Sequence, residues 1–86
     1  MAQVRLSRVL APVVGDRLTL EVPGSTVGAV VAALLDELPQ LRVHLFDQTG
    51  TLRPHVLCVV DDEAVRMEDP DMAATTVEFL HAVSGG

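Results

Sequence analysis

Several residue types are missing from this chain of 86 residues. It contains no lysine, isoleucine, asparagine, tyrosine or tryptophan, and its one cysteine is Cys58. A single cysteine cannot form an internal disulfide. The three histidines, His44, His55 and His81, are scattered along the sequence, so we expect no metal site. Without lysine, the chain cannot accept an isopeptide bond on a lysine side chain of its own.

Positive charge is also scarce. Twelve acidic side chains against six basic ones give a net charge of −6. A nucleic-acid-binding protein needs the opposite balance, so we expect no nucleic-acid partner. The sequence has no long apolar run and does not start with the basic and then apolar residues of a secretion signal. We therefore expect a cytoplasmic protein that does not bind membranes.

The residues that are present describe a small folded domain. Apolar residues make up 49% of the chain and charged ones 21%, which is a globular composition. Eighty-six residues leave room for one core and little spare volume for a deep enzyme pocket. We expect a single domain over residues 1–83 and a flexible Ser-Gly-Gly tail over residues 84–86.

Hydropathy patterns predict several strands and one main helix. The predicted strands cover residues 3–10, 17–22, 56–60, 64–66 and 76–83. The first two form an antiparallel hairpin, with a turn at residues 11–16. The apolar run at residues 56–60 predicts a central strand covered on both faces. Residues 41–53 are weakly patterned and contain a loop signal at residues 48–50.

The main helix follows Pro23 and Gly24. Ser25 or Thr26 can cap it, and apolar residues spaced by three and four continue to Leu38, where Pro39 ends it. One helix across a mixed sheet of four to five strands is an α+β two-layer domain. This order of elements is that of the β-grasp, or ubiquitin-like, fold.

The last two residues, Gly85 and Gly86, suggest a chemical use. Without Cβ atoms, glycines can thread a narrow channel and adopt dihedral angles that other residues avoid. The unhindered carboxylate of Gly86 can be converted to an acyl adenylate, and sulfur transfer to that acyl group leaves a thiocarboxylate. Terminal glycines also occur without function, as frayed ends of a chain.

Three segments of the chain resemble the ThiS/MoaD family of sulfur-carrier proteins. They are the start of the main helix at residues 24–30, the strand and turn at residues 56–66, and the ending at residues 80–86. The stretch over residues 52–66 looks most like the actinobacterial carriers that supply sulfur for cysteine synthesis. The sequence departs from many relatives at His81, where they have proline, and at residues 73–75, where they have Asp-Gly-Asp. The second departure leaves the boundary of the last strand open.

The resemblance implies a carrier that partner enzymes act upon, and not an enzyme with catalytic residues. An enzyme similar to E1 would use ATP to adenylate Gly86, with Gly85 and Ser84 threading into it, and no cofactor would stay bound. Sulfide, a rhodanese or a persulfide enzyme would supply the sulfur. An acceptor enzyme would then use the thiocarboxylate to make cysteine, a cofactor or a specialised metabolite.

Alternatives remain at the level of sequence. Leu80, Ala64 and Val83 are candidates for docking a partner, although an isolated surface leucine is common. We expect Cys58 to be a buried small hydrophobe. The chain could also be an interaction module with an incidental diglycine, such as the small subunit of an enzyme complex like molybdopterin synthase, or a protein modifier. We expect a monomer.

Overall fold

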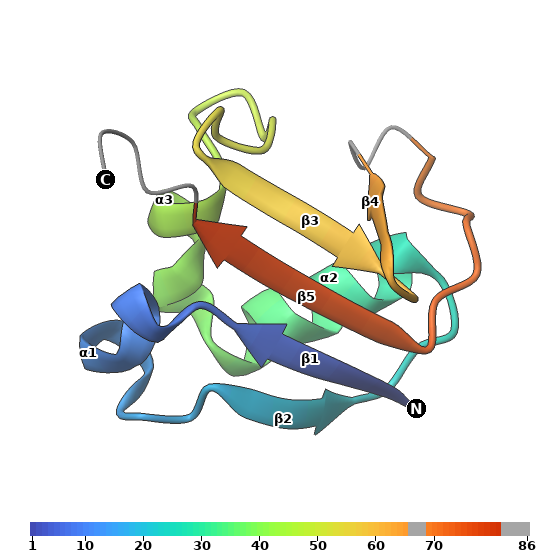
Figure 1. Ribbon diagram of the computed structural model, residues 1–86, viewed down its shortest axis with the longest axis horizontal. Helices are drawn as coiled ribbons and strands as arrows, with labels where there is room; N and C mark the ends of the chain where they lie inside the picture. The colour runs from blue at the N-terminus through green and yellow to red at the C-terminus, as the bar shows by residue number, and fades with distance from the viewer. Residues whose placement is uncertain (66–68, 82–86) are drawn as a thin grey trace.

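The computed structural model describes residues 1–65 and 69–81 (Figure 1). In these residues, five strands form one mixed sheet in the order β2-β1-β5-β3-β4. The parallel pair is β1 with β5, and the other neighbours are antiparallel. The strands are β1 (Ala2–Leu6), β2 (Thr19–Val22), β3 (Val56–Val60), β4 (Glu63–Val65) and β5 (Thr76–His81). The predicted mixed sheet of a β-grasp fold is confirmed.

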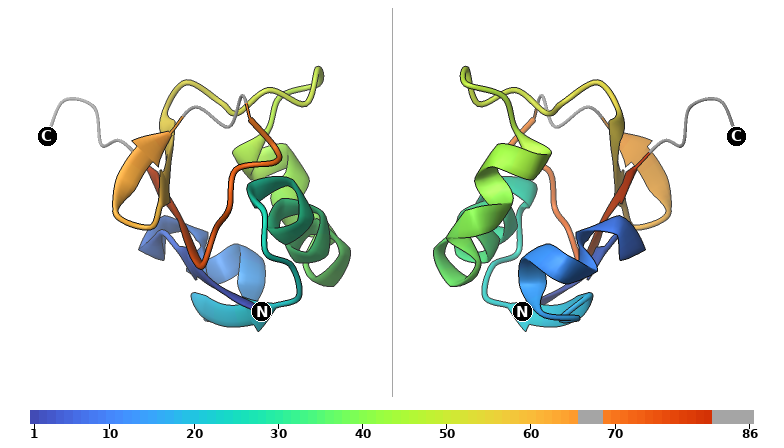
Figure 2. Two further views of the ribbon diagram at one scale, coloured as in Figure 1. Left: turned by 90° about the vertical axis from the view of Figure 1, so that its right-hand side faces the viewer. Right: turned by 90° about the vertical axis from the view of Figure 1, so that its left-hand side faces the viewer.

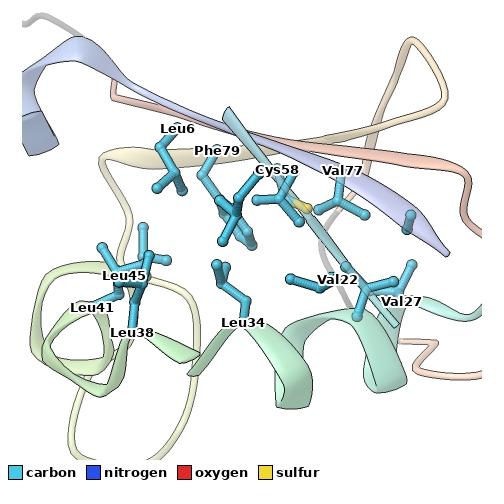
Figure 3. Packing of buried hydrophobic residues seen from close by; sticks show 14 of the residues in the cluster. Leu6, Val22, Val27, Leu34, Leu38, Leu41, Leu45, Cys58, Val77 and Phe79 are labelled. Atoms are coloured by element: carbon cyan, nitrogen blue, oxygen red, sulfur yellow. The ribbon is translucent and has the colours of Figure 1, made fainter. Parts of the chain in front are cut away.

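Helices cover one face of the sheet (Figure 2). The main helix, α2 (Val27–Glu37), is followed by the 3₁₀ helix η2 (Pro39–Leu41) and by α3 (Arg42–Leu45). A 3₁₀ helix, η1 (Arg8–Leu10), and α1 (Ala11–Val14) lie between β1 and β2. The core fills the space between the sheet and α2 (Figure 3). Its fully buried members include Val4, Val30, Leu34, Val77 and Phe79.

The first turn of α2 is closed by neighbouring segments. Of the two caps that the sequence allowed, Ser25 and Thr26, the structure uses Thr26, and its hydroxyl oxygen accepts a hydrogen bond from the third amide of the helix. The amides of Val27 and Gly28 donate to the carbonyls of Met72 and Pro70, both at 2.9 Å. These bonds satisfy N–H groups that a helix leaves unpaired. They also fix the loop that leads into β5 against the helix.

The prediction of a first strand over residues 3–10 is wrong at its end. The strand stops at Leu6, and the predicted turn is occupied by η1 and α1. Leu10 and Val14 are both buried, and their spacing of four is helical. Pro12 does not disturb α1, because the first helical turn needs no N–H from it. Gly15 ends α1 at φ 63°, a conformation that suits glycine.

Two further predictions need correction. Residues 41–53 contain α3, because Leu41 and Leu45 are fully buried one helical turn apart. Strand β3 is not covered on both faces, since Leu57 is 48% exposed while Cys58 is 1% exposed. Helices α2 and α3 lie on one side of the sheet, so alternate residues of β3 face outward.

The last two strands lie where they were predicted, although β4 begins one residue earlier than predicted, at Glu63. β4 covers Glu63–Val65, and the predicted final residue, Arg66, lies outside the described residues. β5 begins at Thr76, as predicted, and His81 is its last described residue. The predicted end of this strand at residues 82 and 83 is likewise outside the described residues.

Candidate functional site

The candidate site is built around β5, which leads to the C-terminal residues. β5 lies in the middle of the sheet, between β1 and β3 (Figure 1). Val77 and Phe79 point into the core and are fully buried, while Glu78 and Leu80 alternate with them on the opposite face. The core therefore fixes the chain as far as Phe79, two residues before His81.

The start of β5 is fixed by the turn between β3 and β4. Asp61 and Asp62 have φ angles of 48° and 73°, a left-handed conformation that aspartate tolerates better than most residues. The Asp61 carboxylate accepts hydrogen bonds from the amides of Thr75 at 3.1 Å and Thr76 at 2.8 Å. The Asp61 amide donates to the Thr76 carbonyl at 3.0 Å. This one residue thus sets where the strand begins.

The sheet face away from the helices carries an apolar patch. Leu57 pairs with Leu80 across β3 and β5, and Val59 pairs with Ala64 across β3 and β4. We call these four residues the outer patch. Leu57 and Ala64 are exposed, and the other two are half-buried. One member of the patch, Leu80, lies on β5 directly before His81, the last described residue of the strand.

The sequence reasoning found two members of this patch and missed the other two. Leu80 and Ala64 lie on the outer face, as predicted. Leu57 and Val59 were assigned to a strand covered on both faces. The signal that could have found them is the single predicted helix, since one helical layer covers one face of a sheet.

The structure does not place every candidate residue. Val83, Ser84, Gly85 and Gly86 lie outside the described residues. Their proposed roles in docking, threading and sulfur transfer therefore remain predictions from the sequence.

Two of the three histidines, although far apart in the sequence, are neighbours in the structure. The rings of His55 and His81 lie 5.6 Å apart between centroids and are tilted by 45°. This contact arises because β3 and β5 are antiparallel and Val56 is paired with His81. Burial first, and then the charges of His55 and His44, lower the pKa of His81. The sequence alone does not predict this contact, because the contact depends on the register between β3 and β5.

The other ionisable candidates take no part in a catalytic cluster. Cys58 is buried, and this burial raises the pKa of its thiol to about 11, so it stays protonated near neutral pH. In the described parts of the chain, no group of three His, Cys, Asp or Glu side chains is arranged to hold a metal ion.

A concave region of about 870 Å³ lies between the start of α2, the loop after α3 and strands β3 and β4. Its described lining is mostly apolar and includes Val31, Phe46, Leu52 and Leu57. Arg53 is the one charged side chain in that described lining. The described walls therefore supply no acid and base pair for catalysis.

A five-stranded mixed sheet with α2 across one face and a parallel β1–β5 pair defines a β-grasp, or ubiquitin-like, domain. The chain belongs to the ThiS family, whose family model matches residues 4–86. No curated protein sequence matches the chain. Among its described helices, none has the length and apolar character needed to cross a membrane.

Solved structures of similar proteins cover the whole domain. A crystal structure of the Amycolatopsis orientalis BexX/CysO complex contains a chain with 22% identity and a TM-score of 0.82, with 100% of both chains covered. Mycobacterium tuberculosis CysO has 28% identity and a TM-score of 0.78 over 96% of this chain and 100% of that one. Haloferax volcanii SAMP1 has 31% identity and a TM-score of 0.70, over 99% and 98%.

Proposed function

We propose that this protein is a sulfur carrier whose reactive group is the C-terminal carboxylate of Gly86. The observation that carries the proposal is the family match, which runs through the final diglycine to residue 86. The similarity to CysO supports the same role. The buried Cys58 and the absence of a described metal cluster leave the terminus as the position where sulfur chemistry is expected.

The proposed chemistry takes place in two steps on partner enzymes. In an activating enzyme similar to E1, a carboxylate oxygen of Gly86 attacks the α-phosphorus of ATP and displaces pyrophosphate. Free bisulfide then attacks the acyl carbon and displaces AMP. Where a rhodanese or persulfide enzyme is the donor, its persulfide sulfur attacks the acyl carbon and AMP leaves, and a thiol then cleaves the resulting acyl disulfide, which releases the thiocarboxylate and leaves a disulfide. The product is a thiocarboxylate, and the acceptor enzyme uses its sulfur to make cysteine, a cofactor or a specialised metabolite. The carrier contributes the acyl group and a docking surface.

The outer patch is the proposed docking surface for the activating enzyme. Leu57 is 48% exposed and lies directly across from Leu80, so the two form an apolar pair that no described element covers. Ala64 extends the patch on β4. Val83 is proposed as a further contact. An apolar patch of this kind beside a reactive terminus is suited to protein binding.

The proposal is tested by intact mass after incubation with ATP, sulfide and an activating enzyme of this family. We expect a mass gain equal to the exchange of one oxygen for sulfur. A variant lacking Gly86 and a variant with one alanine added after it should both stay unchanged. A lengthened chain that acquires sulfur without being trimmed contradicts the proposal. If neither wild-type nor variant chains gain mass, and a chain lacking Gly85 and Gly86 binds its partner as well as wild type, the chain is an interaction module.

A docking variant sharpens the same experiment. Leu57→Ser should reduce the rate of thiocarboxylate formation, because it removes half of the apolar pair. Val43→Ser is a matched control, since Val43 is 64% exposed and lies on α3 in the helical layer. Equal rates for the two variants would show that the outer patch is not the docking surface.

A second candidate function is protein modification. It is favoured by the 31% identity to SAMP1, which is described as a small archaeal modifier protein. A modifier would leave amide-linked adducts between Gly86 and lysines of other proteins. Because the chain has no lysine, it would form single adducts and no lysine-linked chains of itself. Trypsin last cleaves this chain after Arg66, so mass spectrometry of tryptic peptides that carry residues 67–86 as a branch on lysine distinguishes this function from sulfur transfer.

A further inference from the structure

The end of β5 is surrounded by histidines. His81 is the last described residue of the strand, and its Nδ1 atom is buried without a hydrogen-bond partner among the described residues. Strand alternation places its side chain on the same face as Phe79, at the border of the core. The ring of His55, in the turn directly before β3, is 5.6 Å away between centroids. A buried polar atom without a partner costs more when its group is charged.

The neighbours of His81 make its protonation unfavourable. From the segment before β3, His55 acts on it, and from α3, His44 does. Two arginines, Arg42 on α3 and Arg53 before β3, belong to the same elements. The Arg53 Nε donates a hydrogen bond to the Val43 carbonyl at 2.9 Å, so this side chain lies against α3.

On the other side of β5, η1 at the end of β1 carries Arg8. The carboxylate in the loop after α3, Asp47, is occupied by hydrogen bonds from Thr49 and Thr51. These bonds, with the Thr49 hydroxyl first, lower the pKa of Asp47. The recorded ion pair of the described residues, Arg17 with Glu37, involves none of these groups. Among the described residues, the groups recorded as acting on His81 are therefore His55 and His44, and no carboxylate is recorded as its partner.

We infer that His81 is a positioning residue: uncharged and in contact with the ring of His55, it keeps the end of β5 packed against β3, and its protonation releases that end. Val56, the first residue of β3, pairs with His81, and this is the last pairing of β5 among the described residues. The inference about the strand end stands on the contact geometry. Its consequence for sulfur loading rests on the proposed function, because release would change where the segment carrying Gly86 starts.

The direction of the pH effect follows from linkage. Packing holds the pKa of His81 below histidine's ordinary value of about 6.5, and opening of the strand end restores it. The packed state is therefore fully favoured above about pH 6.5, and this advantage is lost as the pH falls toward the lowered pKa. Within that window the opening equilibrium should rise by up to about tenfold per pH unit for one histidine.

The test is amide hydrogen exchange followed by NMR between about pH 7.5 and 5.5, corrected for the intrinsic exchange rate. In the wild type, protection at Leu57 and Leu80 should fall as the pH falls, while protection at Val77 in the strand centre should stay constant. His81→Gln keeps a polar side chain that cannot be protonated, so its protection should not depend on pH. His55→Gln should raise the pKa of His81 and weaken the pH dependence.

The same exchange experiment includes a matched control variant. Glu21→Gln on β2 removes a charge without touching a histidine and should behave like the wild type. Protection that is independent of pH in the wild type would overturn the inference. So would an unchanged pH dependence in both His81→Gln and His55→Gln.

A second measurement addresses the consequence for the carrier. The rate of thiocarboxylate formation is measured for wild type and His81→Gln across the same pH range, and the ratio of the two rates cancels the pH dependence of the activating enzyme. We expect this ratio to change with an inflection at the pKa of His81 measured by NMR. A constant ratio would show that the strand end does not affect loading. Absence of sulfur loading at every pH would count against the proposed function, while the exchange data would still decide the histidine inference.

Discussion

Replacing Asp61 by alanine should destabilise the protein through the start of β5. The substitution removes the acceptor for the amides of Thr75 and Thr76. Because Asp61 is exposed and water competes for these amides, we assign the lost hydrogen bonds about 1 kcal/mol in total. Alanine at φ 48° adds about 1 kcal/mol, since it lacks the local hydrogen bonding that makes this conformation tolerable. The free energy of unfolding should fall by about 2 kcal/mol.

Asp62→Ala is the matched control for this prediction. Asp62 has the same charge and a φ of 73°, but no hydrogen bond of its carboxylate is recorded within the described residues. Its replacement should cost about 1 kcal/mol, from the backbone conformation alone. Asp61→Asn keeps an oxygen acceptor and a residue suited to positive φ, so it should cost less than Asp61→Ala.

Urea denaturation of the three variants and wild type decides the matter. For a domain of this size, about 2 kcal/mol also lowers the melting temperature by roughly 8–16 °C. Equal losses for Asp61→Ala and Asp62→Ala would refute the reasoning, because the hydrogen bonds to β5 would then contribute nothing measurable. An Asp61→Asn variant as unstable as Asp61→Ala would show that the negative charge, and not the acceptor, matters.

Two further predictions concern the helix and the thiol. Gly28→Ala should lower the free energy of unfolding by about 1 kcal/mol, because the added Cβ would lie 2.9 Å from the Pro70 Cβ and 3.0 Å from the Pro70 carbonyl oxygen. This net loss is expected even though alanine favours the helix over glycine by about 1 kcal/mol. A stabilised variant in thermal unfolding would show that the loop yields easily. Cys58 should resist a thiol reagent in the native protein and react after unfolding, because it is 1% exposed and its thiol pKa is raised to about 11. Rapid labelling under native conditions would contradict the buried position of β3.

The main helix and the last strand were predictable because local signals agree with the tertiary structure. In α2 the cap at Thr26, the apolar spacing and the stop at Pro39 all indicate the same helix. In β5 the alternation of buried Val77 and Phe79 with Glu78 and Leu80 needs no further information. The chemical role of Gly86 could also be proposed from the sequence, since it depends on residue type and position.

The features that the sequence did not predict depend on the number of helical layers and on the register between strands. Leu57 is apolar whether it is buried or exposed, and the number of helical layers decides which. His55 and His81 are 26 residues apart in the sequence, and the antiparallel register of β3 and β5 brings them into contact. The helices η1 and α1 were missed for a different reason: each is at most one turn long, too short for a periodic pattern to show.

The arrangement of β5 sets a geometric limit on any enzyme that acts on Gly86. Leu80, in the outer patch, directly precedes His81, so a partner bound to the patch holds the chain one residue from the start of the C-terminal segment. Five residues follow His81, and even fully extended they span at most about 18 Å. A partner docked on Leu57 and Leu80 must therefore place its reactive centre within that distance of the end of β5. The docking surface and the reactive centre of the partner must therefore lie close together. If the docking contact were far from the end of β5, Gly86 could not reach the reactive centre, even with the terminus itself unchanged.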